Sequence, residues 1–236
     1  MLRKTACALT LMFSGLSIAQ PAAAATILIT YTGTVTSGFD EAGLFGESNT
    51  SLKGDTFKSV YTLTYPTSGA VDVNVQGLHE TNGGTGYSLS PPSPLSGQLT
   101  INNHTVSVDG QYRGEHTLIS PGYQGGNTSQ ILDFVYSNGN TSLDNLVENI
   151  NGNNFISSLN FANEFSHTVI LSDNYQGAFH KRNDLGQATD AYFNNLTVSV
   201  QEVGAVPEPA TWGMMIFGFG IAGVTLRVRR RETALA

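Results

Sequence analysis

Cysteine and positive charge are both scarce in this chain of 236 residues. Its single cysteine, Cys7, lies near the N-terminus, so the remainder of the chain has no disulfide and no thiol chemistry. From residue 26 to residue 205, five basic residues stand against sixteen acidic ones, a net charge of about −11. This balance argues against nucleic acid and anionic lipid headgroups as partners. It suits neutral glycans or divalent cations, and an ordinary acidic secreted surface would look the same.

Recognisable catalytic motifs are missing as well. The sequence contains no zinc-protease H-E-x-x-H, no nucleophile elbow G-x-S-x-G, no phosphate loop and no dinucleotide fingerprint. The five histidines stand singly, without the spacing of metal ligands: His79, His104, His116, His167 and His180. We therefore predict no catalytic residue and a non-enzymatic protein. A secreted hydrolase stays an alternative, because the paired carboxylates of glycoside hydrolases meet in space rather than in sequence.

The C-terminal stretch from residue 206 to residue 231 combines three features. Pro207-Glu208-Pro209 is rigid and cannot join a helix interior, and Trp212 to Leu226 is then an uncharged run of fifteen residues. Clustered arginines follow this run, as at the cytoplasmic end of a membrane helix: Arg227, Arg229, Arg230 and Arg231. Fifteen helical residues rise ~22 Å, less than the ~30 Å hydrocarbon core, so the flanking side chains have to complete the span. We predict a transmembrane helix at 210–228 with a basic tail at 227–236. A buried core helix is the alternative, but it would leave the arginines unexplained.

This stretch resembles the C-terminal sorting signal of PEP-CTERM proteins. The resemblance rests on Pro207, Glu208, Pro209, Trp212, a glycine-rich apolar run and the four arginines, in that order. Gly213 stands where the family commonly has alanine after the tryptophan. The resemblance implies that an exosortase, a membrane protease-transferase of Gram-negative bacteria, cuts near Pro-Glu-Pro. The protein would then pass to the cell surface or the exopolysaccharide matrix.

The N-terminal residues 1–25 are typical of a secretory signal peptide. Arg3 and Lys4 precede an apolar segment from Thr5 to Ile18, and a small-residue cleavage site follows at Ala22, Ala24 and Ala25. Positive residues flank both apolar segments on the side that should stay cytoplasmic. We therefore expect the secretion machinery to export residues 26–205 as one domain. The C-terminal segment 206–236 would hold it briefly at the inner membrane, with the domain in the periplasm.

The exported domain has the composition of an all-β protein. Apolar residues alternate with polar ones, as in Ile27, Ile29 and Tyr31 of a first strand, and Asn102-Asn103 predicts the turn of a hairpin. Near-even spacing predicts an antiparallel β-sandwich of jelly-roll type. The expected strands cover 27–36, 57–65, 71–76, 99–101, 106–108, 130–136, 155–161, 166–172 and 192–203.

One short helix is also expected in this domain. Ser142 can cap it and Gly152 can end it. Apolar residues at helical spacing would form its buried stripe: Leu143, Leu146, Val147 and Ile150.

Two features suggest ligands. Asp40, Glu41 and Glu47 lie in a glycine-rich loop whose carboxylates are candidate calcium ligands, although a plain turn uses the same residues. Tyr87 and Tyr123, in expected loops, suggest a glycan-binding module, with or without calcium. The alternating threonines from Thr30 to Thr36 could belong to an ice-binding array, but one strand makes no array.

Overall fold

The computed structural model describes residues 24–139 and 143–203, and this part of the chain is built of antiparallel strands. One 3₁₀ turn, η1 (Tyr123–Gly125), interrupts them. The strands are β1 (Ala25–Asp40), β2 (Thr50–Ser51), β3 (Thr56–Tyr65), β4 (Val71–Val75), β5 (Leu78–Gly83), β6 (Leu95–Ile101), β7 (His104–Val108), β8 (Arg113–Ile119), β9 (Thr128–Asn138), β10 (Leu143–Asn153), β11 (Phe165–Thr168), β12 (Asn174–Arg182) and β13 (Ala188–Val203). The prediction of an all-β antiparallel domain is confirmed.

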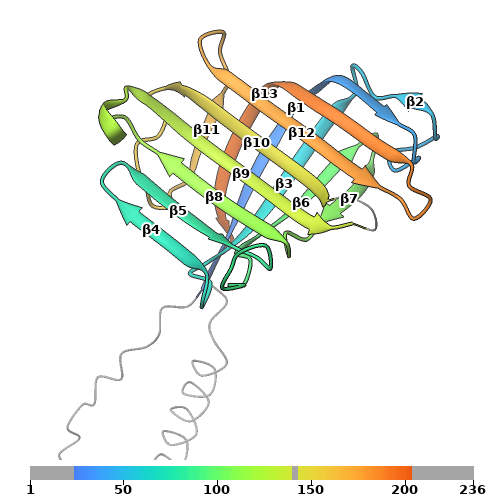
Figure 1. The fold of residues 1–236 in the computed structure, drawn as a ribbon. Helices are drawn as coiled ribbons and strands as arrows, with labels where there is room; N and C mark the ends of the chain where they lie inside the picture. The colour runs from blue at the N-terminus through green and yellow to red at the C-terminus, as the bar shows by residue number, and fades with distance from the viewer. Residues whose placement is uncertain (1–23, 140–142, 204–236) are drawn as a thin grey trace, which may run out of the picture.

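The strands form one continuous sheet that bends over itself into two layers (Figure 1). The order is β4-β5-β8-β9-β10-β12-β13-β1-β3-β6-β7, with β2 beside β1 and β11 beside β13. Strand β6 crosses behind β8, β9 and β10, and Gly97 in β6 lies against Val135 and Leu146 of the opposite layer. The result is sandwich-like, but it is a single bent sheet and not two separate ones.

The long strands β1 and β13 connect the two layers. The front layer contains β8, β9, β10 and β12, and the back layer contains β3, β6 and β7 (Figure 1). The register of β1 against β13 shifts between Thr32 and Thr34 and again between Val35 and Ser37, and such bulges increase local bending. The first part of β13 pairs with β12, and its last part pairs with β11 instead. The partner of β13 along this edge therefore changes from β12 to β11.

The core fills the space between the layers. Ile27, Ile29 and Tyr31 are fully buried, as the alternation in β1 predicts. Asn102 and Asn103 both have positive φ and form the predicted turn between β6 and β7. The strand predicted at 71–76 exists as β4, but its valines are largely exposed because β4 is an edge strand.

The predicted helix at 142–152 is wrong. Leu143–Asn153 is strand β10, paired with β9 and β12 along its length, and Ser142 lies outside the described residues. Leu146 and Ile150 face the core together with Asp144 and Glu148, while Leu143 and Val147 face outward. Two of the inward residues are carboxylates, so apolar and polar residues do not alternate along this strand. The sequence alone therefore does not reveal which of its residues face the core. The strand predicted at 155–161 is also wrong, since these residues form no regular structure.

The two ends of the described domain leave it side by side, because Thr26 pairs with Val203. Within residues 24–139 and 143–203, no helix is long and apolar enough to cross a membrane. The predicted helix at 210–228, the basic tail and most of the signal peptide lie outside the described residues.

Candidate functional site

A shallow cleft of about 520 Å³ lies on the outer face of the front layer, over β9, β10, β12 and β13. We call it the tyrosine-amide cleft. None of the residues that line it carries a formal charge: Tyr136, Asn145, Val147, Tyr175, Gln176, Gly177, Ala178, Tyr192 and Phe193. Charged side chains lie beside this lining: Asp190 precedes Tyr192 by two residues on β13, and Arg113 on β8 is the strand partner of Tyr136.

Strand pairing explains the shape of the tyrosine-amide cleft. Val147 and Ala178 are paired neighbours on β10 and β12, and their short side chains form its floor. Ala178 pairs in turn with Tyr192 on β13, and Asn145 pairs with Tyr136 on β9. The β9 partner of Val147 is Phe134, two residues from Tyr136. Since β9 and β13 are three strand spacings apart, ~14 Å, the two tyrosines therefore lie diagonally across this floor. The side chains of Gln176 and Tyr192 are exposed, with Tyr192 at 54%.

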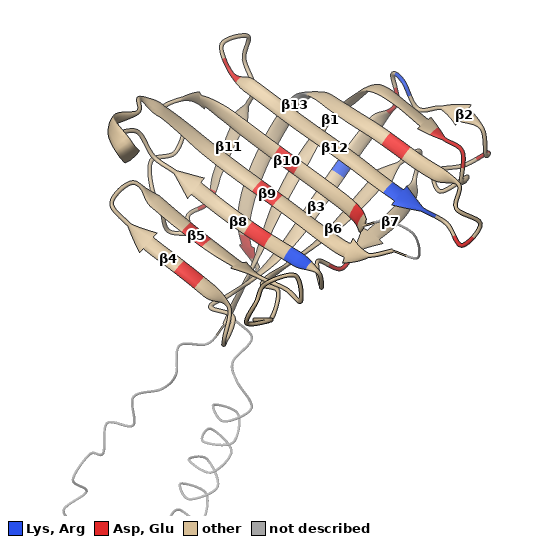
Figure 2. Cartoon of the chain, in the orientation of Figure 1, with Lys and Arg blue, Asp and Glu red and all other residues tan. Residues whose placement is uncertain are grey.

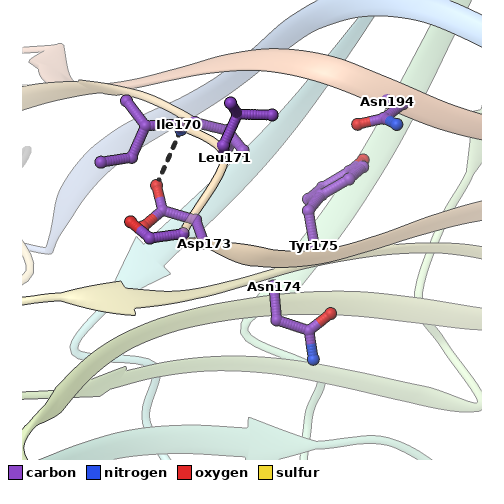
Figure 3. A pocket seen from close by; sticks show the side chains of 8 residues that line it. Ile170, Leu171, Asp173, Asn174, Tyr175 and Asn194 are labelled. Carbon is purple, nitrogen blue, oxygen red and sulfur yellow. Dashed lines mark hydrogen bonds between the residues drawn. The ribbon is translucent and has the colours of Figure 1, made fainter.

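A second cleft of about 960 Å³ adjoins the first and is lined by the loop 169–174 with Tyr175 and Asn194 (Figure 3). We call it the loop cleft. The carboxylate of Asp173 holds the loop in shape, because its Oδ2 accepts a hydrogen bond from the backbone N–H of Ile170 at 3.0 Å and lies 2.8 Å from Nε2 of His167. The side chains of Ile170 and Leu171 at the loop's tip are exposed. The lining of each cleft includes Tyr175 of β12.

Tyr175 connects these clefts to a buried carboxyl group. Its hydroxyl donates a hydrogen bond to Oε2 of Glu148, and the hydroxyl of Ser59 donates to Oε1 at 2.9 Å. Burial, with a smaller contribution from the nearby Asp133 carboxylate, raises the pKa of Glu148 to about 8, although these two hydrogen bonds act to lower it. Burial also raises the pKa of the Tyr175 hydroxyl, and the negative charge on Glu148 adds to that effect.

Asp133 is the centre of a second buried hydrogen-bond network, which lies between the layers. Its Oδ2 accepts a hydrogen bond from the hydroxyl of Tyr31 at 2.6 Å, and its Oδ1 lies 2.7 Å from Nδ1 of His116. Asp133, Tyr31 and Glu148 are fully buried. A carboxylate in this position has no contact with solvent, so Asp133 and Glu148 hold the two layers together and do not line either cleft.

Gly177 has no side chain, and the Tyr175 hydroxyl and the Glu148 carboxyl group occupy the space beside its Cα atom. A Cβ atom at this position would collide with the Tyr175 hydroxyl and with Oε2 of Glu148. We expect Gly177→Ala to lower the free energy of unfolding by ~1–3 kcal/mol, the usual cost of overpacking, measured by urea denaturation. The loss should be smaller in a Tyr175→Phe background, which lacks the hydroxyl. An equal loss in both backgrounds would contradict this assignment.

The three carboxylates predicted as calcium ligands have different surroundings in the structure. Asp40 is fully buried, and its two oxygens accept hydrogen bonds from the backbone N–H groups of Leu44 and Phe45 and from the hydroxyl of Thr189. Oε2 of Glu41 accepts a hydrogen bond from the backbone of Ala188, and Glu47 is exposed. Within the described ranges, no three His, Cys, Asp or Glu side chains gather as metal ligands would. Calcium binding stays a prediction.

The loop tyrosines suggested for glycan binding have structural contacts. The Tyr87 hydroxyl accepts a hydrogen bond from Nε of Arg113 at 3.0 Å, and its ring lies under the guanidinium group. Tyr123 packs closely on Gly77. Sequence reasoning missed Tyr136 and Tyr192, which the tyrosine-amide cleft brings together; their outward direction follows from the strand alternation only once the register is known.

Of the predicted sorting and cleavage residues, Ala24 and Ala25 lie in the described part. Ala25 is the first residue of β1, so cleavage after Ala24 would leave that strand whole. Ala22 lies outside the described residues, as do all of the following: Pro207, Glu208, Pro209, Trp212, Arg227, Arg229, Arg230 and Arg231.

Comparison with family models identifies the C-terminal segment. Residues 205–231 match the PEP-CTERM protein-sorting motif. The resemblance predicted from Pro-Glu-Pro, the tryptophan and the arginine cluster is thereby confirmed. The PEP-CTERM motif implies an exported protein that an exosortase sorts. No curated protein and no solved structure matches this chain, so the domain at 24–203 takes no function from a relative.

Proposed function

We propose that this protein is a non-catalytic component of the cell surface or of an exopolysaccharide matrix. A signal peptide at 1–25 exports it, and the helix at 210–228 holds it in the inner membrane until an exosortase cuts near Pro207-Glu208-Pro209. The observation that carries the proposal is the PEP-CTERM motif at 205–231. The motif directs the sorting of the domain. The lining of the tyrosine-amide cleft has no carboxylate for acid–base chemistry, and the Asp173 carboxylate of the loop cleft is bound to Ile170 and His167.

The position of the two ends of the domain supports this proposal. Thr26 and Val203 are paired neighbours, so both terminal segments start from one point of the domain surface. Cleavage beyond Val203 would therefore release the domain without breaking any strand.

Cell fractionation tests the proposal. In a host with an exosortase, most of the natural chain should reach the surface or medium in a shortened form. Replacing Pro207, Glu208 and Pro209 together with alanine should leave most of the chain full-length in the inner membrane, because the protease loses its site. Glu202→Ala, just before the motif, is the matched control and should behave as the natural chain. Equal release of the triple variant would refute exosortase sorting.

A further inference from the structure

We propose that the tyrosine-amide cleft binds a neutral polysaccharide. The inference rests on the proposed function, because a matrix protein has a reason to hold polymer, and it names the binding surface and the class of ligand. The surface consists of Tyr136 and Asn145 on β9 and β10, and of Gln176 and Tyr192 on β12 and β13.

The chemistry of the lining matches hydroxyl-rich rings. A sugar hydroxyl both donates and accepts hydrogen bonds, and so do the amide groups of Asn145 and Gln176. A sugar ring also has an apolar face of C–H groups, which packs well against an aromatic ring such as that of Tyr192, 54% of whose surface is exposed. Tyrosines on both sides of a floor of Val147 and Ala178 give a run of sugar rings two walls and a level base.

The dimensions fit a short segment of polymer rather than a single small ligand. The cleft of about 520 Å³ is open to solvent along the front layer, and it shares the lining residue Tyr175 with the loop cleft. Asn174 and Asn194 on that side are exposed and add further amides. Asn194 follows Tyr192 by two residues along β13, on the side away from the half-exposed carboxylate of Asp190.

Charge selects neutral polymers over acidic ones. None of the residues that line the tyrosine-amide cleft is a lysine or arginine. Arg113, the strand partner of Tyr136, is paired with Glu115 and donates a hydrogen bond to the Tyr87 hydroxyl. The basic residues of β12, Lys181 and Arg182, lie at the strand's end (Figure 2), where Lys181 pairs with Asp144 and Arg182 donates to the carbonyl of Gly186. With a net charge of about −11 on the domain, an anionic polymer would be repelled.

Affinity electrophoresis of the full chain, purified in detergent, tests this inference. Gels contain dextran, hydroxyethyl cellulose, galactomannan or, as the acidic polymer, alginate. At least one neutral polymer should retard the protein, and alginate should not. The retardation should persist in EDTA, because no carboxylate lines the cleft. If no neutral polymer retards the protein, or if only alginate does, the inference is overturned.

Matched variants locate the binding surface. Tyr136→Ala and Tyr192→Ala should each weaken binding at least tenfold, since buried aromatic contacts commonly dominate an interface. Tyr123→Ala, which alters a tyrosine away from the cleft, should bind as the natural chain does. Circular dichroism verifies that each variant is folded. Unchanged binding by the Tyr136→Ala, Tyr192→Ala double variant overturns the inference.

Two further results would also decide the matter. If the natural chain dimerises with concentration and Tyr192→Ala does not, a second copy occupies the cleft and the inference is overturned. A chain that is sorted normally in the fractionation experiment but binds no neutral polymer refutes this inference alone. A chain that binds through the cleft but is not released by an exosortase refutes the proposed function alone.

Discussion

Asp133→Ala is expected to lower the free energy of unfolding by about 2–5 kcal/mol. The substitution removes an acceptor that lies 2.6 Å from the Tyr31 hydroxyl and 2.7 Å from Nδ1 of His116, between the two layers of the sheet. Both groups are almost completely buried, so water cannot take the place of the carboxylate without opening the core. Urea denaturation at neutral pH measures the loss as a lower transition midpoint.

Glu47→Ala is the control for this experiment. Glu47 is exposed, so its removal should change stability by no more than ~0.5 kcal/mol. Tyr31→Phe keeps the ring and removes only the hydroxyl, and it should cost less than Asp133→Ala because a single partner is lost. A loss below ~1 kcal/mol for Asp133→Ala would show that this buried group contributes little to holding the layers together.

The contribution of Glu148 to the stability of the natural domain is expected to fall as the pH rises from about 4.5 to about 8. In the unfolded chain Glu148 loses its proton near its ordinary pKa of 4.5, but burial raises its pKa in the native state to about 8. Between these values the native state binds more protons, so its stabilisation is complete below pH 4.5 and is lost through pH 8. The contribution of this one group approaches ~1.4 kcal/mol per pH unit. Urea midpoints measured at several pH values record the slope.

Glu148→Gln isolates the contribution of this residue. The amide stays uncharged throughout, so the variant's stability should vary less with pH by up to ~1.4 kcal/mol per unit, and it should exceed that of the natural chain above pH 8. Histidines and other carboxylates contribute equally to both proteins and cancel in the difference. Parallel curves for the two proteins would mean that Glu148 is ionised in the native state and would contradict the expected pKa.

The sequence predicts the strands whose inward residues are apolar. In β1 the alternation of Ile27, Ile29 and Tyr31 against polar neighbours is unbroken, and its inward face is the one expected. The signal fails where polar side chains face the core. Strand β10 hides Asp144 and Glu148 between Leu146 and Ile150, so that only its helix-like apolar spacing is visible. Strands β5 and β8, which were not predicted, likewise bury His79, Glu115 and His116.

The candidate site is less predictable than the fold because its residues come from four strands. Tyr136, Asn145, Gln176 and Tyr192 show no common spacing in the sequence, and only the pairing of β9, β10, β12 and β13 brings them to one surface. The C-terminal sorting motif differs in this respect. Its residues act as a linear signal, so Pro207-Glu208-Pro209 and the arginines are recognisable without any structure.

The position of β13 bears on how the domain withstands mechanical load. This strand is hydrogen-bonded along one edge to β1 and along the other to β12 and then β11, and it ends at Val203. A pull along the axis of β13 would load these hydrogen bonds in parallel, so that many of them share the force instead of opening one after another. Strand pairing on both edges of β13 therefore favours resistance to a force applied along this strand.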